Sequence, residues 1–156
     1  MSAIAVSLPP ESRRVTLRRA QDRGHANFGW LDARFSFSFA SYQDPANENF
    51  GPLRALNEDV ILPGTGFGPH GHNDLEIVLY PLSGVIEHRD SLGTRALVRP
   101  GDVQRMTAGR GITHSQMNAS ESNRTRPLEH HRVEQWQSAH CRGAGRSDPG
   151  GQWGVL

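Results

Sequence analysis

The sequence predicts an all-β domain, either a sandwich or a barrel. Apolar residues between residues 15 and 123 fall in short runs, and Gly, Pro, Asn and Asp punctuate the chain about every 8–12 residues. No part of this stretch repeats its apolar residues with the period of a helix. The 17 glycines and 10 prolines of the 156-residue chain also favour turns over long helices.

The expected strands follow one another in short steps. Residues 33–39 alternate between apolar and polar side chains, with Phe35, Phe37 and Phe39 on the apolar face, which is typical of a half-buried strand. Turn sequences such as Pro100-Gly101-Asp102 punctuate the later part of the stretch. Further strands are expected at residues 75–82, 85–88, 94–99, 103–106 and 112–117.

Two segments differ from this barrel-forming stretch, which we place at residues 15–123. Residues 1–14 are short and polar and are expected to be a loose lead-in. Residues 124–156 are expected to form a polar tail that is disordered or partly helical, with a short helix at residues 129–137. Because the apolar periodicity stops abruptly and residues 127–136 do not look like a buried strand, one hypothesis is that the coding sequence was frameshifted or truncated near residue 124.

Composition argues against several classes of protein. The formal net charge of +1 gives no electrostatic reason to bind nucleic acid directly. No apolar run approaches the roughly 18 residues that a membrane span needs, and the N-terminal residues lack the basic start of a secretory signal. The single cysteine, Cys141, cannot form an intrachain disulfide and fits a reducing compartment, so we expect a cytoplasmic protein.

Two histidine motifs are candidates for a metal site. His70 and His72 are one residue apart, so both imidazoles lie on the same face of a strand, and Glu76 shares that face if the strand continues. His114 lies on a second expected strand. Three imidazoles with one oxygen donor suit Fe, Ni, Cu, Zn or Mn. The alternative is that these are surface or hydrogen-bonded histidines without a metal.

The other histidines carry less information. His25 and His88 lie outside both motifs and are expected to be structural or exposed. Another group matches no zinc-module spacing and is assigned to the tail: His130, His131, His140 and Cys141.

The spacing around the paired histidines resembles the two motifs of the cupin superfamily. Gly64, His70, His72, Glu76 and Gly84 correspond to the first motif, and Gly101, Gly109, His114 and Asn118 to the second. Several segments narrow the resemblance to the pirin family over residues 15–123. They include Asp22-Arg23-Gly24-His25, Gly29-Trp30-Leu31-Asp32, Phe37-Ser38-Phe39-Ala40, Pro63-Gly64-Thr65-Gly66-Phe67-Gly68 and Glu87-His88-Arg89-Asp90-Ser91.

The resemblance implies a single N-terminal cupin jelly-roll barrel that holds Fe(II), or another divalent transition metal. Pirin-like proteins use a His-x-His pair, a third His and a Glu two residues after it, which correspond to His70, His72, His114 and Gln116. Because a Gln carbonyl is a neutral and weaker donor than a carboxylate, we expect weakened or altered metal binding. Gln116 then ligates weakly or through water, or Glu76 is the fourth ligand.

The resemblance also implies the candidate functions. The first is an Fe(II)-dependent quercetin 2,3-dioxygenase-type oxygenase acting on a flavonol, with no catalytic residue assigned beyond the metal ligands. The second is an iron-dependent regulatory module that binds a protein partner. The third is an inactive truncated remnant, because pirin-like chains are longer and carry a second barrel.

Overall fold

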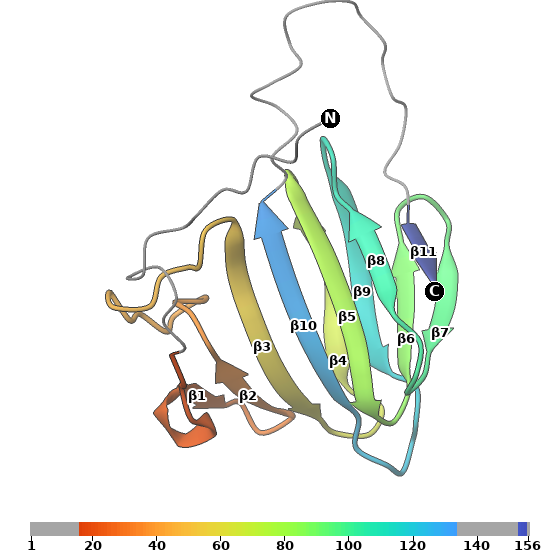
Figure 1. Ribbon diagram of the computed structural model, residues 1–156. Coiled ribbons are helices and arrows are strands. Elements are labelled where there is room, and N and C mark those ends of the chain that lie inside the picture. Colours follow the sequence, from red (N-terminus) through yellow and green to blue (C-terminus); the bar gives the residue numbers. More distant parts are fainter. Residues whose placement is uncertain (1–15, 134–152, 156) are drawn as a thin grey trace, which may run out of the picture.

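The structure is a computed structural model that describes residues 16–133 and 153–155. Two antiparallel sheets pack face to face and enclose the interior of the molecule (Figure 1). The described residues contain one short helix, a 3-10 turn at Ala20–Asp22. None of the described helices has the length and hydropathy to cross a membrane. The prediction of an all-β fold is therefore confirmed.

The larger sheet has seven strands, and every neighbouring pair is antiparallel. In Figure 1, β10 lies between β3 and β5 in the middle of this sheet. In spatial order the strands are β1 (Gly24–Asn27), β2 (Leu31–Phe35), β3 (Leu53–Ile61), β10 (Arg126–Val133), β5 (Leu75–Ser83), β8 (Gln104–Thr107) and β11 (Trp153–Val155).

The smaller sheet has four strands and provides the second wall of the barrel. It lies behind the larger sheet in the view of Figure 1. In spatial order its strands are β4 (Gly66–His72), β9 (Ile112–Asn118), β6 (Ile86–Asp90) and β7 (Arg95–Val98).

The interior between the sheets has an apolar part and a polar part. One apolar cluster is centred on Leu31, Phe35, Leu79 and Ile86, and a smaller one includes Ile77 and Met106. Polar side chains are buried with them, which is costly unless partners or a ligand satisfy them. The buried polar residues are Asn57, Asp59, His88, Gln104, His114, Gln116, Asn118, Thr125, Glu129 and His131.

The prediction of a strand through residue 39 is only partly correct. The strand β2 ends at Phe35, and Leu31, Ala33 and Phe35 are its buried residues. The chain then leaves the sheet, and a turn follows in which Ala40 adopts a positive φ of 50°. Phe39 folds back and stacks on Phe35 with a distance of 5.8 Å between ring centroids. The alternation of phenylalanines thus continues in sequence but not in one strand.

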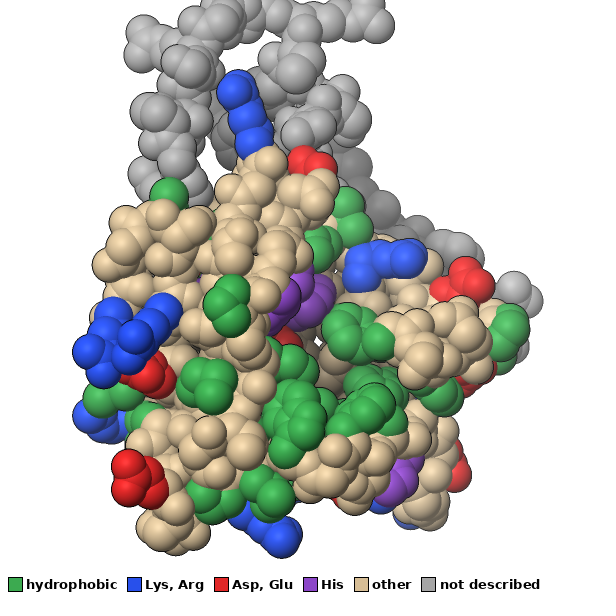
Figure 2. Space-filling view, turned by 180° about the vertical axis from the view of Figure 1, so that it is seen from behind, with side chains coloured by type: hydrophobic (Ala, Val, Ile, Leu, Met, Phe, Trp, Pro, Cys, Tyr) green, Lys and Arg blue, Asp and Glu red, His purple; other side chains and the backbone are tan. Residues whose placement is uncertain are grey.

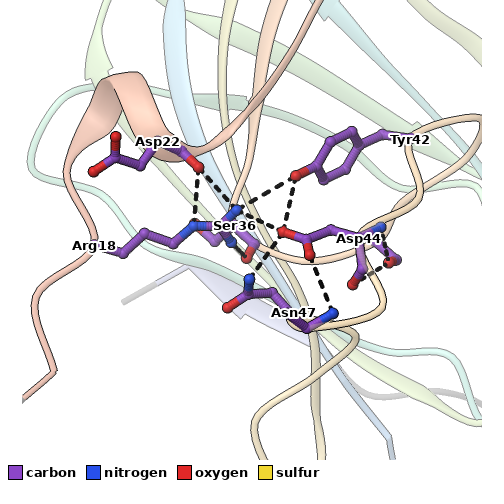
Figure 3. A network of polar contacts seen from close by, with 8 residues as sticks. Arg18, Asp22, Ser36, Tyr42, Asp44 and Asn47 are labelled. Carbon is purple, nitrogen blue, oxygen red and sulfur yellow. Dashed lines mark hydrogen bonds and ion pairs between the residues drawn. The ribbon is translucent and has the colours of Figure 1, made fainter.

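A polar network fastens this turn to the segment before β1 (Figure 3). Arg18 forms an ion pair with Asp44 at 2.8 Å, and Tyr42 and Asn47 donate hydrogen bonds to the same carboxylate. The hydrogen bond from Asn47 is the main reason that the pKa of Asp44 is held below its usual value. Arg18 also donates to the carbonyl of Ser36, so one guanidinium links three parts of the chain.

The prediction of a tail beginning at residue 124 is wrong for the residues that the structure describes. The strand β10 is central in the large sheet and pairs with β3 on one side and β5 on the other. Residues 129–133, where a short helix was expected, also belong to this strand. Its buried positions are Pro127, Glu129 and His131, so the strand period is present but its inner face is not hydrophobic. Residues 134–152, with His140 and Cys141, lie outside the described residues.

Candidate metal centre

Three imidazoles converge on one point inside the barrel. His70 and His72 come from β4, and His114 comes from the neighbouring β9, where it is the register partner of His70. One nitrogen of each ring lies within 4.8 Å of a nitrogen of each other ring. The ring centroids of His70 and His114 are 4.4 Å apart. The small sheet therefore brings the histidines of the two sequence motifs together, as their spacing predicts.

Each of these three rings keeps at least one nitrogen that no hydrogen bond within the described residues occupies and that could bind a metal. The Nδ1 of His70 donates a hydrogen bond to the carbonyl of Gly68 at 2.8 Å, so its Nε2 keeps a lone pair for a ligand. The Nε2 of His72 and both ring nitrogens of His114 are buried without a hydrogen-bond partner. Because unpartnered buried nitrogens are costly, this donor set fits a divalent transition metal.

The environment keeps two of these rings neutral. Burial, followed by the nearby His131 and His70, lowers the pKa of His72 to about 4. Burial lowers the pKa of His114 to about 3, with additional contributions from His70 and His72. Neutral imidazoles present lone pairs at neutral pH without losing a proton first.

Gln116, the expected fourth ligand, is joined to a carboxylate from the opposite sheet. It lies two residues after His114 on the same buried face of β9 and is 2% exposed. Its Nε2 donates to Oε1 of Glu129 on β10 at 2.9 Å. The other carboxylate oxygen lies 3.5 Å from Nε2 of His131. Burial alone raises the pKa of Glu129, but the contacts with His131 and Gln116 outweigh it, so the pKa is lowered overall.

Glu76, the alternative fourth ligand, does not lie with the histidines. The strand β4 ends at His72, and Asp74 turns the chain with a positive φ of 55°, so Glu76 belongs to β5 in the other sheet. Its neighbour Ile77 faces the interior, whereas Glu76 accepts hydrogen bonds from Thr107 at 2.7 Å and Arg105 at 2.9 Å. The shared face expected for His72 and Glu76 required an unbroken strand, which the turn prevents.

Three buried residues near the histidines were missed by sequence analysis. Asn57 and Asp59 lie on β3, and each has a side-chain oxygen without a partner. Burial, followed by the charge of Glu129, raises the pKa of Asp59 to about 7. His131 lies on β10, with its ring centroid 5.3 Å from that of His72. The assignment of His131 to the tail is wrong. Its position follows from the period-two burial of β10, which the polar sequence of this strand does not reveal.

A cavity of about 390 Å³ opens onto these groups. His70, His72, Gln116 and Glu129 are part of its polar wall. In the view of Figure 2, histidine side chains are visible at the edge of an opening, and hydrophobic side chains gather beside it. An apolar cavity with a few convergent polar groups is typical of a small-molecule site. The aromatic side chains of the wall are Phe28, Trp30, Phe35, Phe39 and Phe67.

Two packed sheets around a histidine cluster define the class of the protein, a cupin jelly-roll barrel with a candidate metal site. The particular family is pirin, which matches residues 16–137, and the chain belongs to it. The match extends beyond residues 15–123, over which the sequence segments resemble the family, and it covers β10.

Relatives and solved structures agree with this assignment. The chain is 51% identical over 110 residues to a quercetin 2,3-dioxygenase of Escherichia coli, covering 70% of this chain and 48% of the relative. It is similar to the crystal structure of YhhW from Escherichia coli, with a TM-score of 0.78 and 40% identity over 89% of this chain and 55% of that chain. The same bacterial pirin in complex with nickel(II) gives a TM-score of 0.77, with 40% identity over 89% of this chain and 56% of that one. The chain thus spans about half the length of these relatives.

Proposed function

We propose that this chain binds one divalent transition metal, Fe(II) by preference, through His70, His72 and His114, with Gln116 completing the donor set. The observation that carries the proposal is the convergence of three imidazoles, with their ligand nitrogens within 4.8 Å of one another. The unpartnered nitrogens of His72 and His114 support it. A nickel(II) complex of the related YhhW supports a transition metal without favouring iron.

We further propose that the site carries out quercetin 2,3-dioxygenase-type chemistry on a flavonol-type substrate. The metal, when bound, would supply Lewis acidity and a redox centre. The aromatic wall of the cavity suits a planar ring system, because Trp30 and Phe67 would make edge and face contacts with it. Asp59 would accept the proton of an enol group, because a pKa of about 7 suits a general base near neutral pH.

Metal analysis and oxygen uptake test this proposal. The purified chain is stripped of metal, reconstituted with Fe(II) or Ni(II), and compared with a His114→Ala variant for metal retention and for O₂ consumption with quercetin. We expect the variant to lose both, because the central imidazole is removed. Equal metal content or equal turnover in the variant would contradict the assignment.

A regulatory, protein-binding role is the second candidate function. The observation that favours it is Gln116, because a neutral amide replaces the carboxylate that the family pattern carries at this position. A regulator needs bound metal but no O₂ consumption, so metal retention without oxygen uptake would support it. Failure to retain any metal would instead support an inactive remnant.

A further inference from the structure

The amide of Gln116 has a defined orientation. A carboxylate oxygen can only accept a hydrogen bond at neutral pH, so the group that faces Oε1 of Glu129 is the NH₂ of Gln116. Both side chains are buried, at 2% exposure for Gln116 and 9% for Glu129. Gln116 and His114 lie on the same buried face of β9, and Gln116 lines the cavity together with His70 and His72. The carbonyl oxygen of Gln116 is therefore the donor that this residue can offer to a metal.

The charge that Gln116 lacks is present one hydrogen bond away. Three neutral imidazoles and an amide leave the charge of a divalent cation uncompensated, which is unfavourable in a low-dielectric interior. Glu129 brings a carboxylate into this interior from the opposite sheet. A hydrogen bond that Gln116 donates to a carboxylate also increases the electron density on its own carbonyl oxygen.

We propose that Gln116 and Glu129 act together in place of a single ligating glutamate. The carbonyl oxygen of Gln116 joins His70, His72 and His114 around the metal. Glu129 is a positioning residue: it orients and polarises the amide and supplies the negative charge. This inference rests on the proposed metal site and adds to it the residue that makes a Gln workable as a ligand.

The role of Glu129 can be tested by measuring the metal affinity of a variant in which a neutral side chain of the same shape replaces it. The Glu129→Gln variant keeps the shape and can still accept the hydrogen bond, but it removes the charge. We expect its affinity for nickel(II), measured by competition with a chelator at one pH, to fall about 10–100-fold. Asp59→Asn is the matched control: it neutralises another buried carboxyl of the same cavity that has no hydrogen bond to Gln116. This control is expected to bind nickel(II) at least about tenfold more tightly than the Glu129 variant.

A reversed pair separates this mechanism from a merely structural role. The double variant Gln116→Glu/Glu129→Gln keeps the total charge and reverses the direction of the hydrogen bond. We expect it to recover at least the affinity of the unmodified chain. The absorption spectrum of bound cobalt(II) should shift in both variants. In Glu129→Gln the carbonyl oxygen of Gln116 is less polarised, and in the double variant a carboxylate replaces it as the oxygen donor. Thermal unfolding of the metal-free forms checks that every variant is folded.

The outcomes are distinct. Unchanged affinity in Glu129→Gln, or a double variant that stays as weak as the single one, overturns the role of the pair while leaving the histidine site intact. Equal nickel(II) binding by the unmodified chain and His114→Ala overturns the proposed metal site itself. Loss in Glu129→Gln with recovery in the double variant establishes the pair.

Discussion

The two sheets of the barrel contribute different chemistry to its interior. The small sheet supplies nitrogen donors, because β4 and β9 carry the three converging histidines. The large sheet supplies acidic groups, because β3 and β10 carry Asp59 and Glu129 on their buried faces. The proposed metal ligands and the negative charge of Glu129 thus belong to separate layers. The proposed metal site therefore depends on how the two sheets pack.

The largest effect is expected from a cavity in the apolar part of the large sheet. Leu79 on β5 is 1% exposed and packs in the cluster that also contains Ile61, Ile86 and Val98. Leu79→Ala should lower the free energy of unfolding by about 2–5 kcal/mol, because the neighbouring side chains cannot collapse fully into the space. Urea unfolding of the metal-free protein measures this loss.

The neighbouring residue Val78 provides the control for this change. It lies on the same strand but faces away from the interior and is only half-buried. Val78→Ala should cost clearly less than Leu79→Ala. Equal losses would mean that the apolar cluster between the sheets does not determine the stability of the barrel.

A pH-dependent effect is expected from the acidic layer, which is formed by the buried carboxyl groups of Asp59 and Glu129 in the large sheet. Burial raises the pKa of Asp59 from the usual 3.8 to about 7, so the folded protein favours the protonated form. This contribution to stability is present below about pH 4 and is lost as the pH rises through 7. A difference of about three pH units corresponds to at most about 4 kcal/mol.

Replacing Asp59 by Asn tests this behaviour. The difference in unfolding free energy between Asp59→Asn and the unmodified chain should grow in favour of the variant from pH 4 to pH 8, because the amide never ionises. Other titrating groups contribute to both proteins and largely cancel in the difference. Urea unfolding of metal-free samples across this range provides the measurement, and parallel pH curves would exclude a buried ionisable Asp59.

The small sheet could be predicted from sequence to a greater extent than the large one. His70, His72 and His114 are recognisable because their motif spacing requires no knowledge of packing. The all-β class also followed from turn chemistry and short apolar runs. Glu76 was misplaced as a candidate ligand because the left-handed turn at Asp74 depends on a local conformation that the parity argument did not include.

The acidic layer could not be predicted because it reverses the usual pattern. A strand is identified by apolar residues on its buried face, but β10 buries Glu129 and His131 there. A segment with polar residues on both faces resembles a solvated tail. The cost of burying Glu129 is offset by His131 on the same strand and by Gln116 on β9, and the long-range pairing with β9 is invisible in a local window.

The smallest effect is expected outside the barrel interior, at the network of Figure 3. The pKa of Asp44 is lowered, chiefly by the hydrogen bond from Asn47, so its contribution to stability is present above its usual pKa of 3.8 and is lost as the pH falls through the lowered value. Asp44→Asn should therefore reduce the melting temperature slightly at pH 7 and no longer at strongly acidic pH. Nickel(II) affinity should stay unchanged, because Asp44 contributes to neither wall of the cavity. A change in metal affinity as large as that of Glu129→Gln would mean that the division of the interior into a nitrogen layer and an acidic layer does not account for the site.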